Sequence, residues 1–370
     1  MSLRLLLIED CDIEVQVWQD TVEALRAEQN EEIILCSVKA VRCAVEKLES
    51  IDYDGIIVDL HLGDDEANGS TFIEILQSKL LRIPTIVVSG TPNELSDELR
   101  ARCLAVKDRS AVDQRIEIDR FRRMRNVGLS SIIGGRGRIE TKLTDVFQSA
   151  ILPQIDSWLS YGSEENEIAE RALLRHVLLH LIQALDDENS QELTYFMEEF
   201  YLLIPDSNGR RPGSLMMRRS DDVAVIVLNP ACDLEVRGEG CKAKTLLVAE
   251  VDSFLSTVGP LPPGLLSKTK KKEIKQFLNN NKGSGQHLHW MPPSLKHEGG
   301  FINFAKLSTY DEDEIDDKLS YLEIRVAPPF LKDIVARFSS FYARQGQPKL
   351  ESEDYLTSIE IPVNHGASNS

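Results

Sequence analysis

In the first third of the chain, polar side chains that could carry out chemistry each follow a short apolar run. They are Glu9 and Asp10 after LRLLLI, Asp59 after GIIV, Ser89 after PTIVV, and Lys107 after CLAV. Three carboxylates held together repel one another and suit a divalent cation, and Mg²⁺ prefers oxygen ligands. We therefore expect Mg²⁺ at Glu9, Asp10 and Asp59. Asp59 would also be a nucleophile that accepts a phosphoryl group as an acyl phosphate.

The two remaining side chains suit the charge of such a group. The metal and the Lys107 ammonium would neutralise charge that develops on the phosphoryl oxygens. The Ser89 hydroxyl would donate a hydrogen bond to one of these oxygens after transfer. These roles require that four separate segments of the chain meet at one place.

A parallel sheet would bring the four segments together. Strands are expected at 3–8, 32–38, 84–89 and 103–106, with a further strand ending at Asp59; helices are expected at 13–28, 39–50, around 72–76, from 91, and from 110 to about 125. Strands that alternate with helices predict a doubly wound α/β domain. Because the C-terminal ends of parallel strands gather at one edge, all the polar residues named above should lie there.

This segment resembles the receiver domain of two-component response regulators, over about 125 residues. The resemblance rests on Glu9-Asp10, Asp59, Ser89 and Lys107 in that order, each at a strand end. It implies a flavodoxin-like fold with a five-stranded parallel sheet. It also implies a phosphoryl group taken from a histidine kinase or phosphotransfer protein, Ser89 and Lys107 as phosphate-binding switch residues, and a backbone carbonyl ligand to Mg²⁺ from His61.

Several positions depart from the family pattern. Gly63 replaces a proline four residues after Asp59, Leu104 replaces the switch aromatic, and Asp108 replaces the proline after the lysine. The loop 59–69 is also longer than usual and adds three acids. These departures predict an unusual output route. They leave open a receiver that no longer accepts phosphate and serves as a docking or decoy domain.

Composition places the chain among globular proteins of more than one domain. A chain of 370 residues is too long for one ordinary hydrophobic core, and its hydrophobic content is 42%. The formal net charge of -18 opposes general binding to nucleic acid or acidic membranes, although a local basic patch could still act. No apolar run reaches the roughly 20 residues of a membrane span, and the cysteines lack paired spacing. We expect a cytoplasmic protein with reduced thiols and no membrane contact.

Changes in local composition and residue pattern divide the chain into five parts. They are a receiver domain at 1–125, a Gly- and Ser-rich linker at 126–138, a helical segment at 139–204, a smaller α+β output module at 205–350, and a loose tail at 351–370. The module is expected to be β-rich and barrel-like because short strands alternate with Gly and Pro. The apolar surface of 164–185 is broad, so this segment could form a bundle, a homodimer contact or a transmission helix.

The C-terminal module carries residues for metal or nucleophilic chemistry without an established catalytic motif. The candidates are Cys232, Asp233, Cys241, His287, His289 and His297. Zinc sites prefer paired cysteines two to four residues apart, a spacing that these cysteines lack. The alternatives are an enzyme acting on a nucleotide or nucleic acid, and structural residues in a small core.

A second feature of the module is basic. Lys268, Lys270, Lys271, Lys272 and Lys275 open a predicted helix and could neutralise phosphates of a nucleic acid. A solvated helix face is the alternative, and no known nucleic-acid-binding motif is recognisable. A third possibility is a protein partner at the aromatic residues near the turns, which could equally fill the core.

Overall fold

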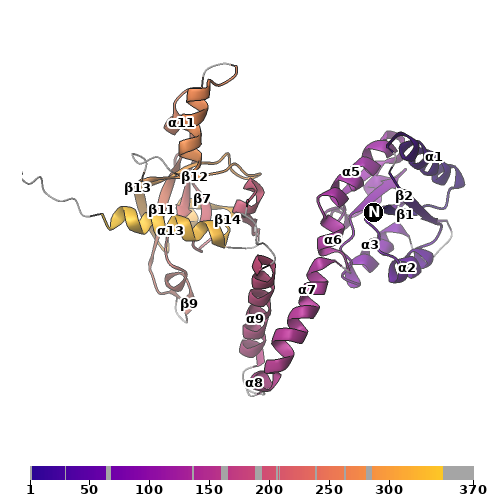
Figure 1. Cartoon of the computed structure of the whole chain (residues 1–370), viewed down its shortest axis with the longest axis horizontal. Coiled ribbons are helices and arrows are strands. Elements are labelled where there is room, and N and C mark those ends of the chain that lie inside the picture. The colour runs from indigo at the N-terminus through magenta and orange to yellow at the C-terminus, as the bar shows by residue number, and fades with distance from the viewer. Residues whose placement is uncertain are drawn as a thin grey trace, which may run out of the picture. The chain divides into compact units, whose positions relative to one another are not determined.

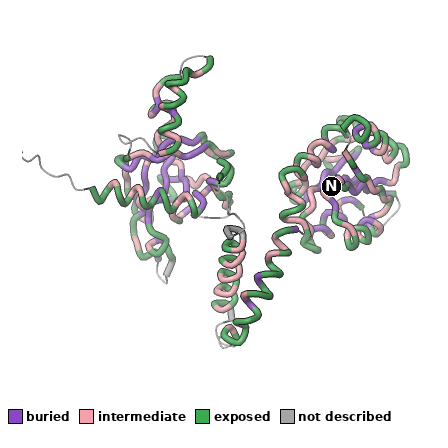
Figure 2. The backbone as a smooth tube through the Cα atoms, viewed as in Figure 1, coloured by how far each residue is buried: buried purple, intermediate pink, exposed green. Residues whose placement is uncertain are grey.

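The computed structural model describes residues 2–29, 31–63, 68–135, 137–159, 166–187, 194–205, 207, 209–237, 240–261, 264–280 and 286–344. The chain forms two compact units, Met1–Glu192 and Leu193–Ser370 (Figure 1). Buried residues concentrate in the strands of both units (Figure 2). Within the described ranges, no helix combines the length and apolar character needed to cross a membrane.

The first unit begins with a sheet of five parallel strands. They are β1 (Leu3–Ile8), β2 (Ile33–Val38), β3 (Gly55–Val58), β4 (Thr85–Ser89) and β5 (Ala105–Asp108). Their spatial order is β2-β1-β3-β4-β5, which is the order of flavodoxin-like folds. The predicted doubly wound, five-stranded parallel sheet is confirmed.

Helices cover both faces of this sheet. Alternate strand residues point to opposite faces, so the continuous apolar runs fill two cores. One core joins the sheet to α1 (Asp12–Gln29) and α5 (Gln114–Asn126), and includes Trp18 and Phe121. The other core joins the sheet to α2, α3 and α4 around Phe72. The bounds of these three helices are Val41–Ser50, Gly69–Ser78 and Asp97–Arg100.

Two element boundaries differ from the sequence expectation. The strand expected at 103–106 runs to Asp108, because its pairing with β4 continues until Ser89 meets Asp108. Lys107 and Asp108 are polar residues on an edge strand, so no apolar pattern marks their place in it. The helix expected from residue 91 is a single 3₁₀ turn, Pro92–Glu94, followed by the four-residue α4.

A helical part completes the first unit. It contains α6 (Leu129–Ile133), α7 (Arg138–Val146), α8 (Ile155–Leu159) and α9 (Asn166–Asp187), and α7 contacts α9. Residues 129–133 of the expected linker are therefore helical. Arg82 ties this part to the sheet, since its Nε donates to the Ile133 carbonyl at 2.7 Å and its guanidinium pairs with Glu140.

The second unit is built on seven antiparallel strands. Their order is β12-β13-β11-β8-β7-β14-β6, and the sheet curls into a half-barrel, in line with the expected barrel-like α+β module (Figure 1). The strands are β6 (Tyr201–Leu203), β7 (Ser214–Arg218), β8 (Val223–Val227), β11 (Thr245–Asp252), β12 (Leu288–Met291), β13 (Gly300–Asp311) and β14 (Leu319–Val326). The helical segment expected at 139–204 therefore ends too late, because residues 201–203 form β6 of this sheet.

Short helices and a small hairpin surround the half-barrel. α13 (Pro328–Tyr342) packs on one face, and α11 (Lys268–Leu278) packs by Ile274 and Phe277 near Phe301 of β13. The hairpin pairs β9 (Val236–Arg237) with β10 (Gly240–Cys241), and the remaining helices are α10 (Phe254–Val258) and α12 (Ile315–Lys318). The expected loose tail at 351–370 lies outside the described residues.

Candidate functional site

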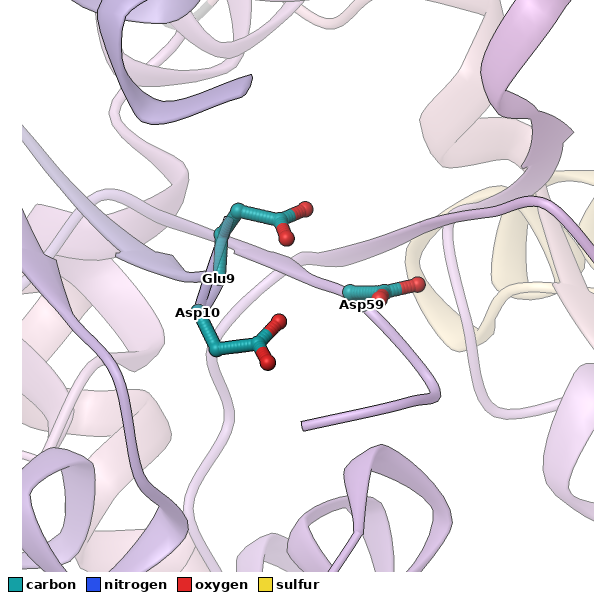
Figure 3. A group of neighbouring side chains, drawn as sticks. All are labelled: Glu9, Asp10 and Asp59. Atoms are coloured by element: carbon teal, nitrogen blue, oxygen red, sulfur yellow. The ribbon is translucent and has the colours of Figure 1, made fainter. Parts of the chain in front are cut away.

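Two neighbouring strand ends bring three carboxylates together. β1 and β3 are paired so that Ile8 lies opposite Val58, and Glu9, Asp10 and Asp59 follow these residues. Glu9 is 4% exposed and Asp59 is 3% exposed. One carboxylate oxygen from each of the three residues lies within 4.8 Å of the other two, and Figure 3 shows the side chains gathered at this edge. The arrangement expected from the sequence is therefore present in the structure.

The backbone around Asp59 is held closely. Its N–H donates to the Ile8 carbonyl at 3.0 Å, and its Oδ1 accepts the Leu60 N–H at 2.8 Å. The first residue of α3 must be small because a Cβ on Gly69 would lie 2.1 Å from the Asp59 carbonyl oxygen. These contacts fix the direction of the Asp59 carboxylate.

Gly63 explains one departure from the family pattern. It has a φ of 57°, which proline cannot adopt because its ring fixes φ near -65°. A Cβ at this position would lie 3.3 Å from Oδ2 of Asp10. The glycine therefore lets the loop after β3 pass close to the acidic cluster. The acids at 64–66 lie outside the described residues.

The three carboxylates are electrostatically strained. Burial, followed by the charges of Asp59 and Asp10, raises the pKa of Glu9 to about 7, although the Cys11 N–H and Arg109 oppose this shift. The donor set consists of oxygen atoms only, and its mutual repulsion would be relieved by a divalent cation. The residues present thus fit Mg²⁺.

Arg109 is the cation that contacts this cluster. It begins the 3₁₀ turn after β5, Arg109–Ala111. Its Nη2 lies 2.8 Å from Oδ2 of Asp59 and 3.2 Å from Oε2 of Glu9. Desolvation lowers the pKa of the guanidinium, but the charges of Asp59, Glu9 and Glu14 outweigh this effect and raise it. Sequence reasoning missed Arg109, because the apolar pattern placed the strand end at Lys107.

Lys107 contacts α5, and no ion pair joins it to the acidic cluster among the described residues. Its neighbour in the β-ladder is Val88, which packs on the face covered by α1 and α5. The Lys107 Nζ lies 3.5 Å from Oε1 of Glu117, a buried residue of α5. The predicted lysine therefore links β5 to α5 in this structure.

Ser89 and His61 occupy neighbouring positions on the same edge. Ser89 ends β4, is fully buried, and accepts a long 3.4 Å hydrogen bond from the Thr91 N–H. The His61 side chain is exposed, with its Nε2 2.7 Å from the Thr91 hydroxyl and 3.0 Å from a Glu94 carboxylate oxygen. The backbone carbonyl of His61 stays the predicted further ligand for Mg²⁺.

The cysteine candidate of the second unit lies on an exposed turn. Cys232 belongs to the 3₁₀ turn Ala231–Asp233, and its Sγ is 3.7 Å from Oδ1 of Asp233. Asp233 also lies 3.7 Å from the Lys242 ammonium. The side chain of Cys241 lies outside the described residues.

The histidine candidates occupy structural positions near β12. His289 is buried, and its ring nitrogens lie 2.9 Å from the Trp290 carbonyl and 3.1 Å from Oδ2 of Asp333 on α13. His287 packs beside the Phe341 ring, and Nδ1 of His297 accepts the Gly299 N–H. Across the described parts of the chain, the acidic cluster of the first unit is the one group of three or more metal-ligating side chains.

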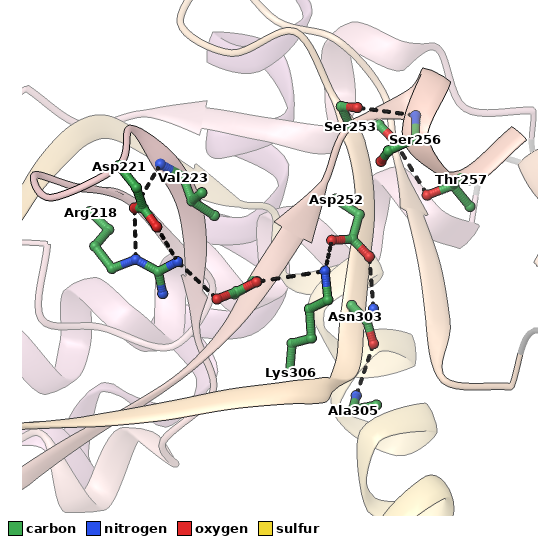
Figure 4. Close-up of polar contacts among 11 residues, drawn as sticks. Arg218, Asp221, Val223, Asp252, Ser253, Ser256, Thr257, Asn303, Ala305 and Lys306 are labelled. Atoms are coloured by element: carbon green, nitrogen blue, oxygen red, sulfur yellow. Dashed lines mark hydrogen bonds and ion pairs between the residues drawn. The ribbon is translucent and has the colours of Figure 1, made fainter. Parts of the chain in front are cut away.

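Charged residues also form a row across the half-barrel (Figure 4). Arg218 pairs with Asp221 and Glu250 at 2.8 and 2.9 Å. The Lys306 ammonium lies 2.6 Å from Asp252 and 3.8 Å from Glu250. Because these pairs join β7, β11 and β13, the row cross-links the sheet.

Known structures resemble the first third of the chain, whereas no protein-family model and no curated protein matches it. A receiver domain of a Francisella response regulator is 16% identical, with a TM-score of 0.28 over 34% of this chain and 98% of its own. A CheY-like receiver domain from Methylobacillus flagellatus is 19% identical, with a TM-score of 0.26 over 31% and 91%. A sensor protein from Polaromonas sp. JS666 is 21% identical, with a TM-score of 0.28 over 33% and 94%.

Such low identities concern the fold alone. The strand order of the first unit is by itself that of the flavodoxin-like receiver fold. The resemblance stated for residues 1–125 is therefore confirmed for the fold.

Proposed function

We propose that the chain is a two-component response regulator whose first unit accepts a phosphoryl group on Asp59 with Mg²⁺. The observation that carries this proposal is the buried carboxylate of Asp59, held at a strand end between two further acids and a guanidinium. The donor of the phosphoryl group would be a histidine kinase or a phosphotransfer protein.

Phosphoryl transfer at this site needs little more than positioning and charge neutralisation. An Asp59 carboxylate oxygen forms a bond to phosphorus while the bond to the donor's leaving group breaks, and the leaving group departs with the electron pair. Mg²⁺ bound at Glu9, Asp10 and Asp59 would supply positive charge. The Arg109 guanidinium supplies positive charge in direct contact with Asp59, and we assign to it the neutralising role that was expected of Lys107.

The buried Ser89 hydroxyl is the proposed hydrogen-bond donor to the transferred group. Its present contact, the long bond from the Thr91 N–H, leaves its own hydrogen available. It ends β4, the strand paired with β3, and Asp59 is the first residue after β3. A shift of Ser89 toward a phosphoryl oxygen would carry the Thr91 turn with it.

The proposed output route runs through α5. No aromatic side chain stands at residue 104, and Leu104 packs in the core with α1 and α5. The Lys107–Glu117 pair connects the strand that precedes Arg109 to α5, and the chain continues from α5 into α6 and α7. Movement of the Arg109 turn would thus pass to the helical part and to the C-terminal module that the receiver controls.

A homodimer through the helical segment stays a prediction. Its basis in the structure is that α9 leaves large aliphatic side chains exposed, which are Ile168, Leu174, Leu178, Leu179 and Ile182. Sedimentation of the full chain with and without a phosphodonor would measure the association.

Mass spectrometry tests the phosphoryl acceptor. The full chain is incubated with Mg²⁺ and acetyl phosphate, and the modified peptide is mapped. We expect one acyl phosphate on Asp59, absent in Asp59→Asn and retained in Asp108→Asn, which removes an exposed carboxylate nearby. Absence of labelling in the wild-type chain would leave the docking or decoy role for this unit.

A further inference from the structure

The exposed face of α11 carries a row of lysines that the proposed receiver chemistry does not use. Lys268, Lys271, Lys272 and Lys275 are spaced i, i+3, i+4 and i+7, so they lie within an arc of about 100° on the helix. All four are exposed, and the row is about 10 Å long. We call these four residues the lysine stripe.

The fifth lysine of the predicted basic cluster points elsewhere. The Lys270 ammonium donates to the Val258 carbonyl at 3.1 Å and to Oε2 of Glu273 at 3.3 Å. It therefore helps to attach α11 to its own unit. This residue supplies an internal control for any function of the stripe.

The stripe has no carboxylate partner in the part of the chain that the structure describes, although the sequence is rich in acids. Within the described residues, none of its four ammonium groups pairs with a carboxylate. Eight lysines outside α11 do pair with one, namely Lys39, Lys79, Lys107, Lys142, Lys242, Lys296, Lys306 and Lys318. Four neighbouring lysines that lack a carboxylate partner among the described residues are unusual in a protein with 60 acids against 42 lysines and arginines.

The placement of these charges opposes helix stability. The first turn of α11 contains no acid, and Lys268 and Lys271 lie near the positive end of the helix dipole. Lys268 and Lys272, like Lys271 and Lys275, are like charges one turn apart, which repel. Among the described residues of the second unit, no carboxylate pairs with these ammonium groups to offset the repulsion, which favours an external partner that does.

The apolar side of α11 holds the stripe rigidly. Ile274 is buried, and Phe277 lies edge-on to Phe301 with ring centroids 5.7 Å apart. Trp290 belongs to the same cluster, and its backbone N–H donates to Oδ1 of Asn280, just after the helix. The lysines are therefore presented on a helix already fixed to the sheet, which lowers the entropy cost of binding.

We propose that the lysine stripe binds the sugar–phosphate backbone of a nucleic acid without reading its sequence. A row of compact ammonium charges matches a row of phosphates. Thr269, Gln276 and Asn279 flank the stripe and are side-chain types that contact phosphate and sugar. A membrane surface fits less well, because the large apolar side chains of α11 face the sheet and leave none on the stripe to enter a bilayer.

The test is a salt titration of binding to a fluorescent mixed-sequence DNA duplex, with the full chain. Four neutralised phosphates predict a slope of about -3.6 in a plot of log affinity against log salt. Affinity should then fall about 150-fold between roughly 50 and 200 mM salt. The variant with all four stripe lysines changed to glutamine should lose binding, and the double variant Lys271→Gln/Lys275→Gln should halve the slope.

Two controls separate the stripe from net charge. Changing Lys79, Lys242, Lys296 and Lys318 to glutamine alters the net charge equally and should leave the slope unchanged. Lys270→Gln should leave it unchanged too. The proposal is overturned by a wild-type chain that does not bind at the lowest salt, by a slope that the four stripe substitutions do not alter, or by stripe-dependent binding to vesicles of anionic lipid without binding to DNA.

Discussion

Replacing Arg109 with alanine should change metal binding and phosphoryl transfer in opposite directions. The guanidinium lies 2.8 Å from Asp59 and 3.2 Å from Glu9, and both carboxylates are buried. At an effective dielectric of about 20, each contact has a gross attraction of roughly 5–6 kcal/mol, most of which offsets desolvation. Removing one partner of a buried pair typically costs about 3–5 kcal/mol. Without divalent cations, Arg109→Ala should therefore destabilise the first unit by about 3 kcal/mol.

Divalent cations should rescue this loss. Mg²⁺ would neutralise the same carboxylates and would no longer be repelled by a neighbouring guanidinium. We expect Mg²⁺ to bind Arg109→Ala about 10- to 30-fold more tightly than the wild type, which corresponds to about 1.4–2 kcal/mol. Isothermal titration calorimetry of the full chain measures this change.

Phosphoryl transfer should instead slow. Loss of one preorganised donor to developing charge commonly costs about 100-fold in rate. We expect this loss in acetyl phosphate labelling of Arg109→Ala at saturating Mg²⁺. Lys107→Ala removes one positive charge as well, but from the contact with Glu117. It should change the Mg²⁺ affinity and the labelling rate by less than about threefold each. The reasoning is refuted if Lys107→Ala blocks labelling while Arg109→Ala labels at the wild-type rate, or if Arg109→Ala binds Mg²⁺ more weakly.

Three further changes test other parts of the structure. Burial raises the pKa of Glu9 to about 7, and a carboxyl must be deprotonated to bind a metal. The Mg²⁺ affinity should therefore fall about tenfold per pH unit below pH 7 and level off above it. Calorimetry measures this profile, which should be flatter in Glu9→Gln. Gly69→Ala places a Cβ against the Asp59 carbonyl and should cost about 1–3 kcal/mol in urea denaturation, whereas Gly135→Ala, with open space around it, should be neutral. His289→Ala should lower the stability of the second unit by about 2–4 kcal/mol by thermal denaturation without changing metal content; an unchanged melting curve would contradict its bridging role.

Buried parallel strands can be recognised in a sequence as continuous apolar runs. For this reason the cluster of Glu9, Asp10 and Asp59 could be predicted. The four residues before Glu9 and the four before Asp59 are all apolar and buried, since helices cover both faces of these strands. The edge strand β5 has one neighbour and polar residues at its end, so its boundary was placed too early. Because of that shift of two residues, Arg109 was not among the predicted site residues.

The second unit was harder to foresee because its order depends on distant pairings. β14 pairs with β7 across about 100 residues, and no local pattern encodes that register. The helix at 268–278 was predicted, and its spacing alone separates Lys270 from the four other lysines. The hydrogen bond from Lys270 to the Val258 carbonyl could be identified only from the structure, because no local sequence pattern encodes it.

Phosphoryl stoichiometry at Asp59 tests the central claim most directly. The intact full chain is treated with acetyl phosphate in Mg²⁺ or in EDTA, and its mass is measured before and after hydroxylamine, which cleaves acyl phosphates. The account predicts one hydroxylamine-sensitive phosphoryl group per chain in Mg²⁺, none in EDTA, and none in Asp59→Asn. A wild-type chain that stays unmodified in Mg²⁺, or a modification that survives Asp59→Asn, would contradict it.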